Sequence, residues 1–277
     1  MSEASSLGSV MSSDQAVRDA ARSGAADRYL SALLAPRSVR ADLIALAAFS
    51  SEIEKIAMQV TEPHLGEIRT QWWRDVLSVD AGVSGHPVAD AFTATIRRHA
   101  LPHERIDDFL DAHVHALYAD PPADDRQLQL ELDLREGVLF ALAAHILGAP
   151  GLDPASGIIH DAAQAYGLAR LGMALPFSLA RGRVPVPVQA HDNSPDHDWR
   201  MEIAKLNVTA RRHMEHVRSA YGAERSAVKA ALLPVALVEP YLRALSQASN
   251  DPARDITDIA PLTRVWRLAK THLRGRV

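Results

Sequence analysis

The stretch YGLARLGMALPFSLARGRVPVP, residues 166–187, begins as an apolar helix and ends in a basic turn bounded by prolines. Pro176 is expected to kink this helix, because proline lacks an N–H group and its ring crowds the preceding turn. Pro185 and Pro187 are expected to end the helical pattern for the same reason. The stretch therefore predicts a long apolar helix that closes on an arginine-containing turn.

The rest of the chain shows the same helical periodicity. Between residues 37 and 60, apolar residues recur at steps of three and four, which is typical of an amphipathic helix. Similar segments are separated by prolines and glycines, with a strong break at residues 148–151. No alternating pattern typical of strands is present. The sequence predicts an all-α protein of about ten helices, with a flexible segment over residues 1–24 and one helical domain over residues 25–277.

The composition excludes several classes of protein. The chain has 277 residues, of which 47% are hydrophobic and 23% charged, so it is not a disordered chain. A net charge of -4 gives no indication of nucleic-acid binding. The absence of cysteine excludes disulfides and thiolate metal sites. No apolar run reaches the roughly 18 residues that a membrane span needs, and the first residues lack the pattern of a secretory signal.

The stretch at residues 166–187 resembles the second signature of the squalene/phytoene synthase family. In that signature a helix carries two aspartates four residues apart and ends in Gly-Arg-x-x-x-Pro. Gly182, Arg183 and Pro187 match the ending. The two aspartate positions fall on Ala174 and Ser178. The frame of the signature is therefore present, but its metal-binding carboxylates are not.

A second resemblance lies at AFSSEIEKIAM, residues 48–58. Family members carry there an aromatic residue and then the string Asp-Asp-x-x-Asp. The aromatic residue is present as Phe49, while Glu54, Lys55 and Met58 stand at the three aspartate positions. Of these three, only Glu54 is a carboxylate.

The chain is most similar to a branch of the family that includes the mitochondrial assembly factor for respiratory complex I. The features shared with this branch are Gln71-Trp72-Trp73-Arg74-Asp75, Pro176-Phe177, Leu232-Leu233-Pro234 and a late helix with Trp266. The resemblance covers roughly residues 27–270. It implies the class I isoprenoid synthase fold, a single helical bundle around a central cavity.

The resemblance implies a reaction in which Mg²⁺, held by two aspartate clusters, neutralises a leaving diphosphate. Mg²⁺ binds carboxylate oxygens and substrate phosphates, and no such cluster can be assembled from the residues at these positions. The expected function is therefore a non-catalytic assembly factor for a respiratory membrane complex, with no cofactor, or a lipid or isoprenoid binder. The alternative is a divergent Mg²⁺-dependent transferase that condenses prenyl diphosphates.

Candidate partners follow from the basic residues. The resemblance places Arg170 inside the cavity, where it would bind an anionic or lipid-like ligand together with Arg183 and Glu54. Residues 261–277 form a basic helix with a tryptophan, which suits peripheral contact with an anionic membrane. We expect a cytoplasmic protein peripheral to the inner membrane, or one of the mitochondrial matrix in a eukaryote, with a respiratory-complex subunit, a prenyl diphosphate or a lipid as its partner.

Two further patterns invite a metal-site interpretation. The string Asp107-Asp108-x-x-Asp111 spells the metal motif outright, but it lies between the two signatures and is interpreted as a solvated acidic helix face. His213 and His216 lie at helical spacing without an obvious carboxylate partner in the sequence. The sequence therefore predicts no metal site at either place.

Overall fold

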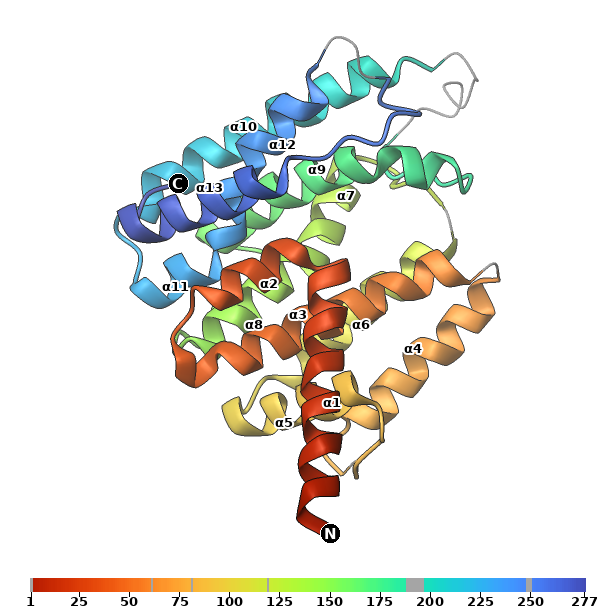
Figure 1. Cartoon of the computed structure of the whole chain (residues 1–277). Coiled ribbons are helices and arrows are strands. Elements are labelled where there is room, and N and C mark those ends of the chain that lie inside the picture. Colours follow the sequence, from red (N-terminus) through yellow and green to blue (C-terminus); the bar gives the residue numbers. More distant parts are fainter. Residues whose placement is uncertain (1, 61, 81, 119, 188–196, 248–250) are drawn as a thin grey trace. The chain divides into compact units, whose positions relative to one another are not determined.

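The computed structural model describes residues 2–60, 62–80, 82–118, 120–187, 197–247 and 251–277 (Figure 1). All regular elements within these ranges are helices, and no strand occurs among them. The chain divides into two compact units. Unit 1 comprises Met1–Leu117 and Leu142–Pro150, and unit 2 comprises Tyr118–Ala141 and Gly151–Val277.

Unit 1 is built around helix α3. Its helices are α1 (Ser2–Gly24), α2 (Ala26–Leu33), α3 (Arg37–Gln59), α4 (Pro63–Leu77), α5 (Pro87–His99) and α6 (His103–His115), followed by the short 3₁₀ helix η1 (Ala116–Tyr118). Phe49 of α3 is fully buried and stacks on Phe92 of α5 with ring centroids 4.3 Å apart. Its ring also meets the edge of Trp73 of α4 at 5.5 Å. The aromatic position of the first signature is therefore a core position.

Helix α1 occupies residues for which the sequence predicted a flexible segment. It packs along α3, and its side chains Val17 and Ala21 are buried. A Cβ atom on Gly24 would lie 1.9 Å from the Oγ atom of Ser51, so the two helices approach closely at this glycine. Although this segment is rich in serine, Val17 and Ala21 form a short apolar stripe that packs against α3.

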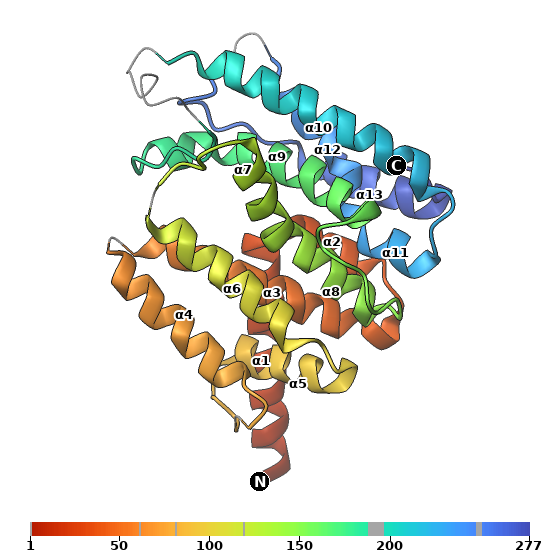
Figure 2. The ribbon, with the colours of Figure 1, turned by 180° about the vertical axis from the view of Figure 1, so that it is seen from behind.

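Unit 2 contains the helix that the sequence placed at its centre. Its elements are α7 (Asp125–Leu132), the π-helical turn η2 (Asp133–Gly137), α9 (Gly157–Leu179), α10 (Trp199–Tyr221), α11 (Ser226–Ala231), the 3₁₀ helix η3 (Leu233–Leu237), α12 (Val238–Leu245) and α13 (Pro261–Arg274). Helix α8 (Val138–Ile146) follows η2 and is divided between the two units after Ala141. Helices α9 and α10, green and cyan, run side by side in both views (Figures 1 and 2).

Small residues on α9 allow its neighbours to approach. A Cβ atom on Gly167 would lie 2.7 Å from Leu132 Cδ2, and one on Gly172 would lie 2.7 Å from Leu245 Cδ1. Helices α7 and α12 therefore pack against the α9 backbone at these two points. Larger side chains at either glycine would overpack the core.

Helix α9 ends at an arginine-containing turn, as expected, but it ends before Pro185 and Pro187. Helix α9 contains Pro176 in its last turn and ends at Leu179. Gly182 adopts a left-handed φ of 69°, and the Arg183 N–H then donates to the Ser178 carbonyl at 3.0 Å. Glycine adopts this conformation without the steric cost that a Cβ atom imposes. The Gly-Arg pair of the signature thus terminates the helix.

Two local features of the helices have identifiable causes or consequences. Helix α4 begins at Pro63, because proline is favourable in the first turn, where its missing N–H would have no helical partner. The π-helical turn η2 interrupts the helical run from α7 to α8. Such insertions of one residue often occur at functional sites.

Candidate functional site

The three first-signature positions lie in the second half of α3. Lys55 Nζ donates to Glu52 Oε1 at 2.7 Å, so its charge is engaged by a neighbour on the same helix. Met58 is 53% exposed, and Glu54 is half-buried. Of the three positions where the family has aspartates, only that of Glu54 carries a carboxylate.

The second-signature positions lie near the end of α9. Ala174 is exposed and Ser178 is half-buried, and neither side chain offers a carboxylate. Mg²⁺ requires oxygen ligands in an octahedral arrangement, usually including carboxylates from the protein. The donor set at the five signature positions does not fit the Mg²⁺ sites that the family pattern implies.

The two candidate binding arginines are both in unit 2. Arg170 Nη1 donates to Glu136 Oε1 at 3.0 Å, and its guanidinium lies 5.7 Å from the centre of the Tyr166 ring. Burial, followed by repulsion from Arg181, lowers the pKa of Arg183. Arg170 is therefore held by a buried carboxylate, whereas Arg183 lies beside a second cation.

The acidic string on α6 is engaged by basic side chains of unit 1. Arg74 of α4 forms ion pairs with Asp111 and, at 3.8 Å, with Asp107. Asp108 pairs with Arg105 at 3.3 Å. The side chains of Asp107 and Asp111 are more than half exposed. These carboxylates therefore form a solvated helix face that helps to join α6 to α4.

A buried carboxylate that the sequence did not single out lies on α3. Asp42 is 3% exposed and accepts hydrogen bonds from Thr95, Arg98 and His99 of α5. The His99 Nε2 atom lies 2.9 Å from Asp42 Oδ2. Because burial of an unpaired carboxylate is costly, these donors stabilise the α3–α5 contact. The partners lie more than fifty residues away in the sequence, so no local pattern indicates them.

A second buried network surrounds the π-helical turn in unit 2. Asp133 accepts from His160 Nδ1 at 2.8 Å and from Gln164 Nε2 at 2.9 Å. Burial raises the pKa of Asp133 above its ordinary value of 3.8, although the hydrogen bond from Gln164 and the charge of His160 oppose this effect. The π-helical turn thus places a buried carboxylate against the first turns of α9.

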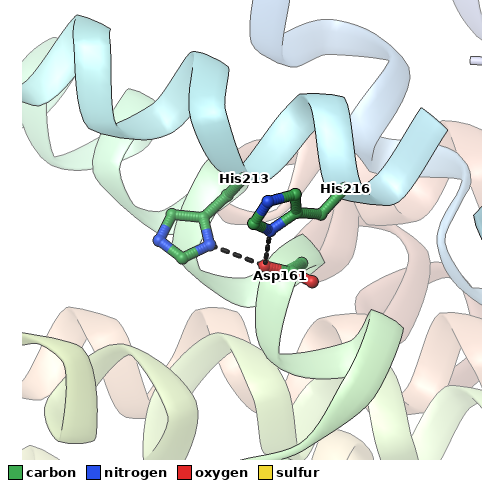
Figure 3. Close-up of side chains that lie close together, drawn as sticks. All are labelled: Asp161, His213 and His216. Atoms are coloured by element: carbon green, nitrogen blue, oxygen red, sulfur yellow. Dashed lines mark hydrogen bonds and ion pairs between the residues drawn. The ribbon is translucent and has the colours of Figure 1, made fainter. Parts of the chain in front are cut away.

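Two histidines of α10 meet a carboxylate of α9 (Figure 3). The Nδ1 atoms of His213 and His216 lie 2.7 and 3.2 Å from Asp161 Oδ1. The carboxylate partner that the sequence did not indicate is therefore Asp161, 52 residues before His213. Burial lowers the pKa of His213, and the hydrogen bond with Asp161 opposes this shift.

Helix α13 presents two different faces. Its exposed apolar side chains are Leu262, Val265, Trp266 and Leu273. A groove of about 570 Å³ lies beside them, lined by Arg267, Lys270, Thr271, Arg274, Arg276 and Val277. Leu268 and Thr271 are buried and attach the helix to unit 2. The exposed stripe is therefore apolar with a basic border.

None of the helices in the described part of the chain is both long and apolar enough to span a bilayer.

Comparison with known proteins finds similar sequences and, separately, similar solved structures. The chain is 26% identical over 238 residues to the Bos taurus protein "NADH dehydrogenase (ubiquinone) complex I, assembly factor 6", covering 80% of this chain and 71% of that protein. The Homo sapiens protein of the same name is 24% identical over 236 residues, with 80% and 71% covered.

Solved structures show the same fold. The squalene synthase HpnC from Alicyclobacillus acidocaldarius superposes with a TM-score of 0.64 at 16% identity, covering 95% of this chain and 94% of that one. A dehydrosqualene synthase solved in complex with ligand gives a TM-score of 0.70 at 13% identity, with 97% and 99% covered. The all-α isoprenoid synthase-like fold is therefore confirmed. The family model for squalene/phytoene synthase matches residues 21–270, and the chain belongs to the squalene/phytoene synthase family.

Proposed function

We propose that this chain is a non-catalytic member of the family that acts as an assembly factor for a respiratory membrane complex. The observation that carries the proposal is the loss of donors at the five signature positions, where Glu54 is the one carboxylate. The similarity to complex I assembly factor 6 over four fifths of the chain supports the same function. The fold is retained while the metal-binding chemistry is not.

The energetic consequence of these replacements is large. A metal acting as a Lewis acid on a phosphoryl oxygen stabilises the transition state by several kcal/mol. Because each ~1.4 kcal/mol is a factor of ten in rate, loss of the metal slows the chemistry by several orders of magnitude. Lys55 does not replace a metal here, because its ammonium is paired with Glu52.

The first experiment tests catalysis. The purified chain is incubated with farnesyl or geranylgeranyl diphosphate and Mg²⁺, and diphosphate release and extracted products are measured. We expect no release and no Mg²⁺-dependent tightening of diphosphate binding. Release accompanied by a hydrocarbon or alcohol product would establish the transferase alternative, with Mg²⁺ as its cofactor.

The second experiment tests assembly. The gene is deleted in the source organism, and the amount of assembled complex I is measured on native gels with and without complementation. We expect the wild type and Glu54→Gln to restore the complex equally, because a non-catalytic factor does not use this carboxylate. Failure of Glu54→Gln alone, with normal protein levels, would contradict a non-catalytic role.

A second candidate function is binding of an anionic isoprenoid or lipid at Arg170 and Arg183. The partly buried Arg183 beside Arg181 favours it, since two adjacent guanidinium groups suit a diphosphate. The pairing of Arg170 with Glu136 weakens the contribution of Arg170. Arg183→Ala should reduce the affinity for farnesyl diphosphate measured without Mg²⁺. Unchanged affinity in both Arg170→Ala and Arg183→Ala would exclude this function.

The exposed face of α13 supports peripheral attachment to an anionic membrane surface. Such attachment would place an assembly factor at the membrane in which a respiratory complex is built. Leu262, Trp266 and Leu273 can enter the headgroup region, while the basic groove meets lipid phosphates. In flotation assays, vesicles with anionic lipid should bind the chain, and neutral vesicles should not. Replacement of Leu262, Trp266 and Leu273 by serine should abolish binding, and an unchanged result would exclude this surface.

A further inference from the structure

We propose that Asp161, His213 and His216 form a binding site for a divalent transition-metal ion, for which Zn²⁺ is the suitable test ion. Two imidazoles and one carboxylate are a ligand set that Zn²⁺ accepts. This inference goes beyond assembly and rests on residues that neither family signature includes.

The two helices place the three side chains together. Asp161 lies in the second turn of α9, and the two histidines lie in the second half of α10. Residues three apart on a helix project from the same face, so His213 and His216 both reach the same carboxylate. Figure 3 shows both rings turned toward Asp161 from the neighbouring helix.

The distances are close to those of a metal site. The three ligand atoms lie within 4.8 Å of one another. With metal–ligand bonds of about 2.1 Å, tetrahedral geometry separates two ligand atoms by about 3.4 Å. The two carboxylate–imidazole distances are 2.7 and 3.2 Å, so an ion needs only a small displacement of these side chains.

Burial gives the site a fixed side and an open side. The side chain of His213 is 9% exposed and that of Asp161 is 20% exposed, whereas His216 is 60% exposed. The ring nitrogen of His213 that faces Asp161 is Nδ1, 2.7 Å from Oδ1, so this is the nitrogen that an ion in the site would meet. His213 Nε2 is buried and has no hydrogen-bond partner among the described residues. Packing therefore holds two ligands in place, while the third can swing and admit the ion from solvent.

Charged groups of both signs surround the site. The carboxylate of Asp161 favours a cation at His213, whereas the charges of His160 and Arg212 disfavour one. The ring of His160 lies 5.6 Å from that of His213. The Asp161 carboxylate is therefore the group that attracts an ion to the two imidazoles.

The test uses the full chain after dialysis against a chelator, titrated with ZnCl₂ by calorimetry. We expect one tight site per chain in the wild type. His216→Ala and Asp161→Asn should weaken it by at least about a hundredfold, since loss of even an outer-shell partner can cost that much. His115→Ala, which removes an exposed histidine of unit 1, is the matched control and should leave the affinity unchanged.

Asp161→Asn separates the metal site from a simple hydrogen-bond cluster. Asparagine still accepts a hydrogen bond from an imidazole N–H, but it is a poorer metal ligand because it carries no charge. His216 is exposed, so His216→Ala should fold as the wild type does, which circular dichroism checks. Equal Zn²⁺ affinity in wild type, His216→Ala and His115→Ala would overturn the proposal, whatever the behaviour of Asp161→Asn.

Discussion

The acidic string of α6 looks like a metal site in the sequence but not in the structure, whereas the Asp161 cluster of α9 and α10 looks like one in the structure but not in the sequence. Asp107, Asp108 and Asp111 spell a metal motif in five consecutive residues, yet arginines of unit 1 hold all three. The Asp161 cluster is not visible in the sequence, yet its ligand atoms converge within 4.8 Å. The difference teaches that a sequence motif does not leave a carboxylate open to a metal when arginines already pair with it, whereas side chains far apart in the sequence can converge on one carboxylate.

The largest expected effect is on the free energy of unfolding, and it distinguishes the buried Asp42 of unit 1 from the exposed acidic string of α6. Asp42→Ala should lower the free energy of unfolding by about 3 kcal/mol, because it leaves His99 and Arg98 without their buried partner. Urea unfolding monitored by circular dichroism gives this value. A loss below about 1 kcal/mol would mean that burial does not distinguish Asp42 from the exposed acidic string.

The next effect compares the two carboxylate sets directly as metal ligands. Asp161→Asn should weaken Zn²⁺ binding by about a hundredfold, equal to roughly 2.7 kcal/mol. Asp111→Asn should leave Zn²⁺ binding unchanged, because Arg74 already occupies this carboxylate. The comparison would be reversed if calorimetry found the greater loss in Asp111→Asn.

The third effect concerns pH and the buried Asp133. The pKa of Asp133 is higher in the folded state than the ordinary value of 3.8 that it has in the unfolded state. Its contribution to the folding stability is therefore complete at pH values below 3.8. This contribution is lost as the pH rises through the folded pKa. Asp133→Asn stays neutral, so its stability relative to the wild type should increase as the pH rises. Urea unfolding at several pH values measures this trend, and a relative stability that falls with pH would contradict the raised pKa.

The smallest effect concerns the exposed string itself. Asp111→Ala should change the free energy of unfolding by less than about 1 kcal/mol, because solvent screens an exposed ion pair. Thermal unfolding at low and high salt checks both the size of the effect and its screening. A loss comparable to that in Asp42→Ala would show that the α4–α6 ion pairs carry much more of the fold than their exposure indicates.

Most helices of this protein could be predicted from the sequence. Apolar spacing indicated α3, and the Gly182-Arg183 turn indicated that α9 ends close to it. These signals are local, since a helix requires one apolar stripe and suitable residues at its ends. Helix α1 was missed because its stripe is short and gains its stability from packing on α3, which no local pattern reports.

The sequence by itself determined the family frame and the missing aspartates, because a signature is a set of residue types at fixed spacing along one helix. The Asp161 cluster, the Asp42 network and the pairing of Arg74 with Asp111 were decided only by the tertiary structure. Each joins two helices whose contact depends on packing over long separations in the chain. A side chain's chemistry depends on these neighbours, which no spacing within a single helix can specify.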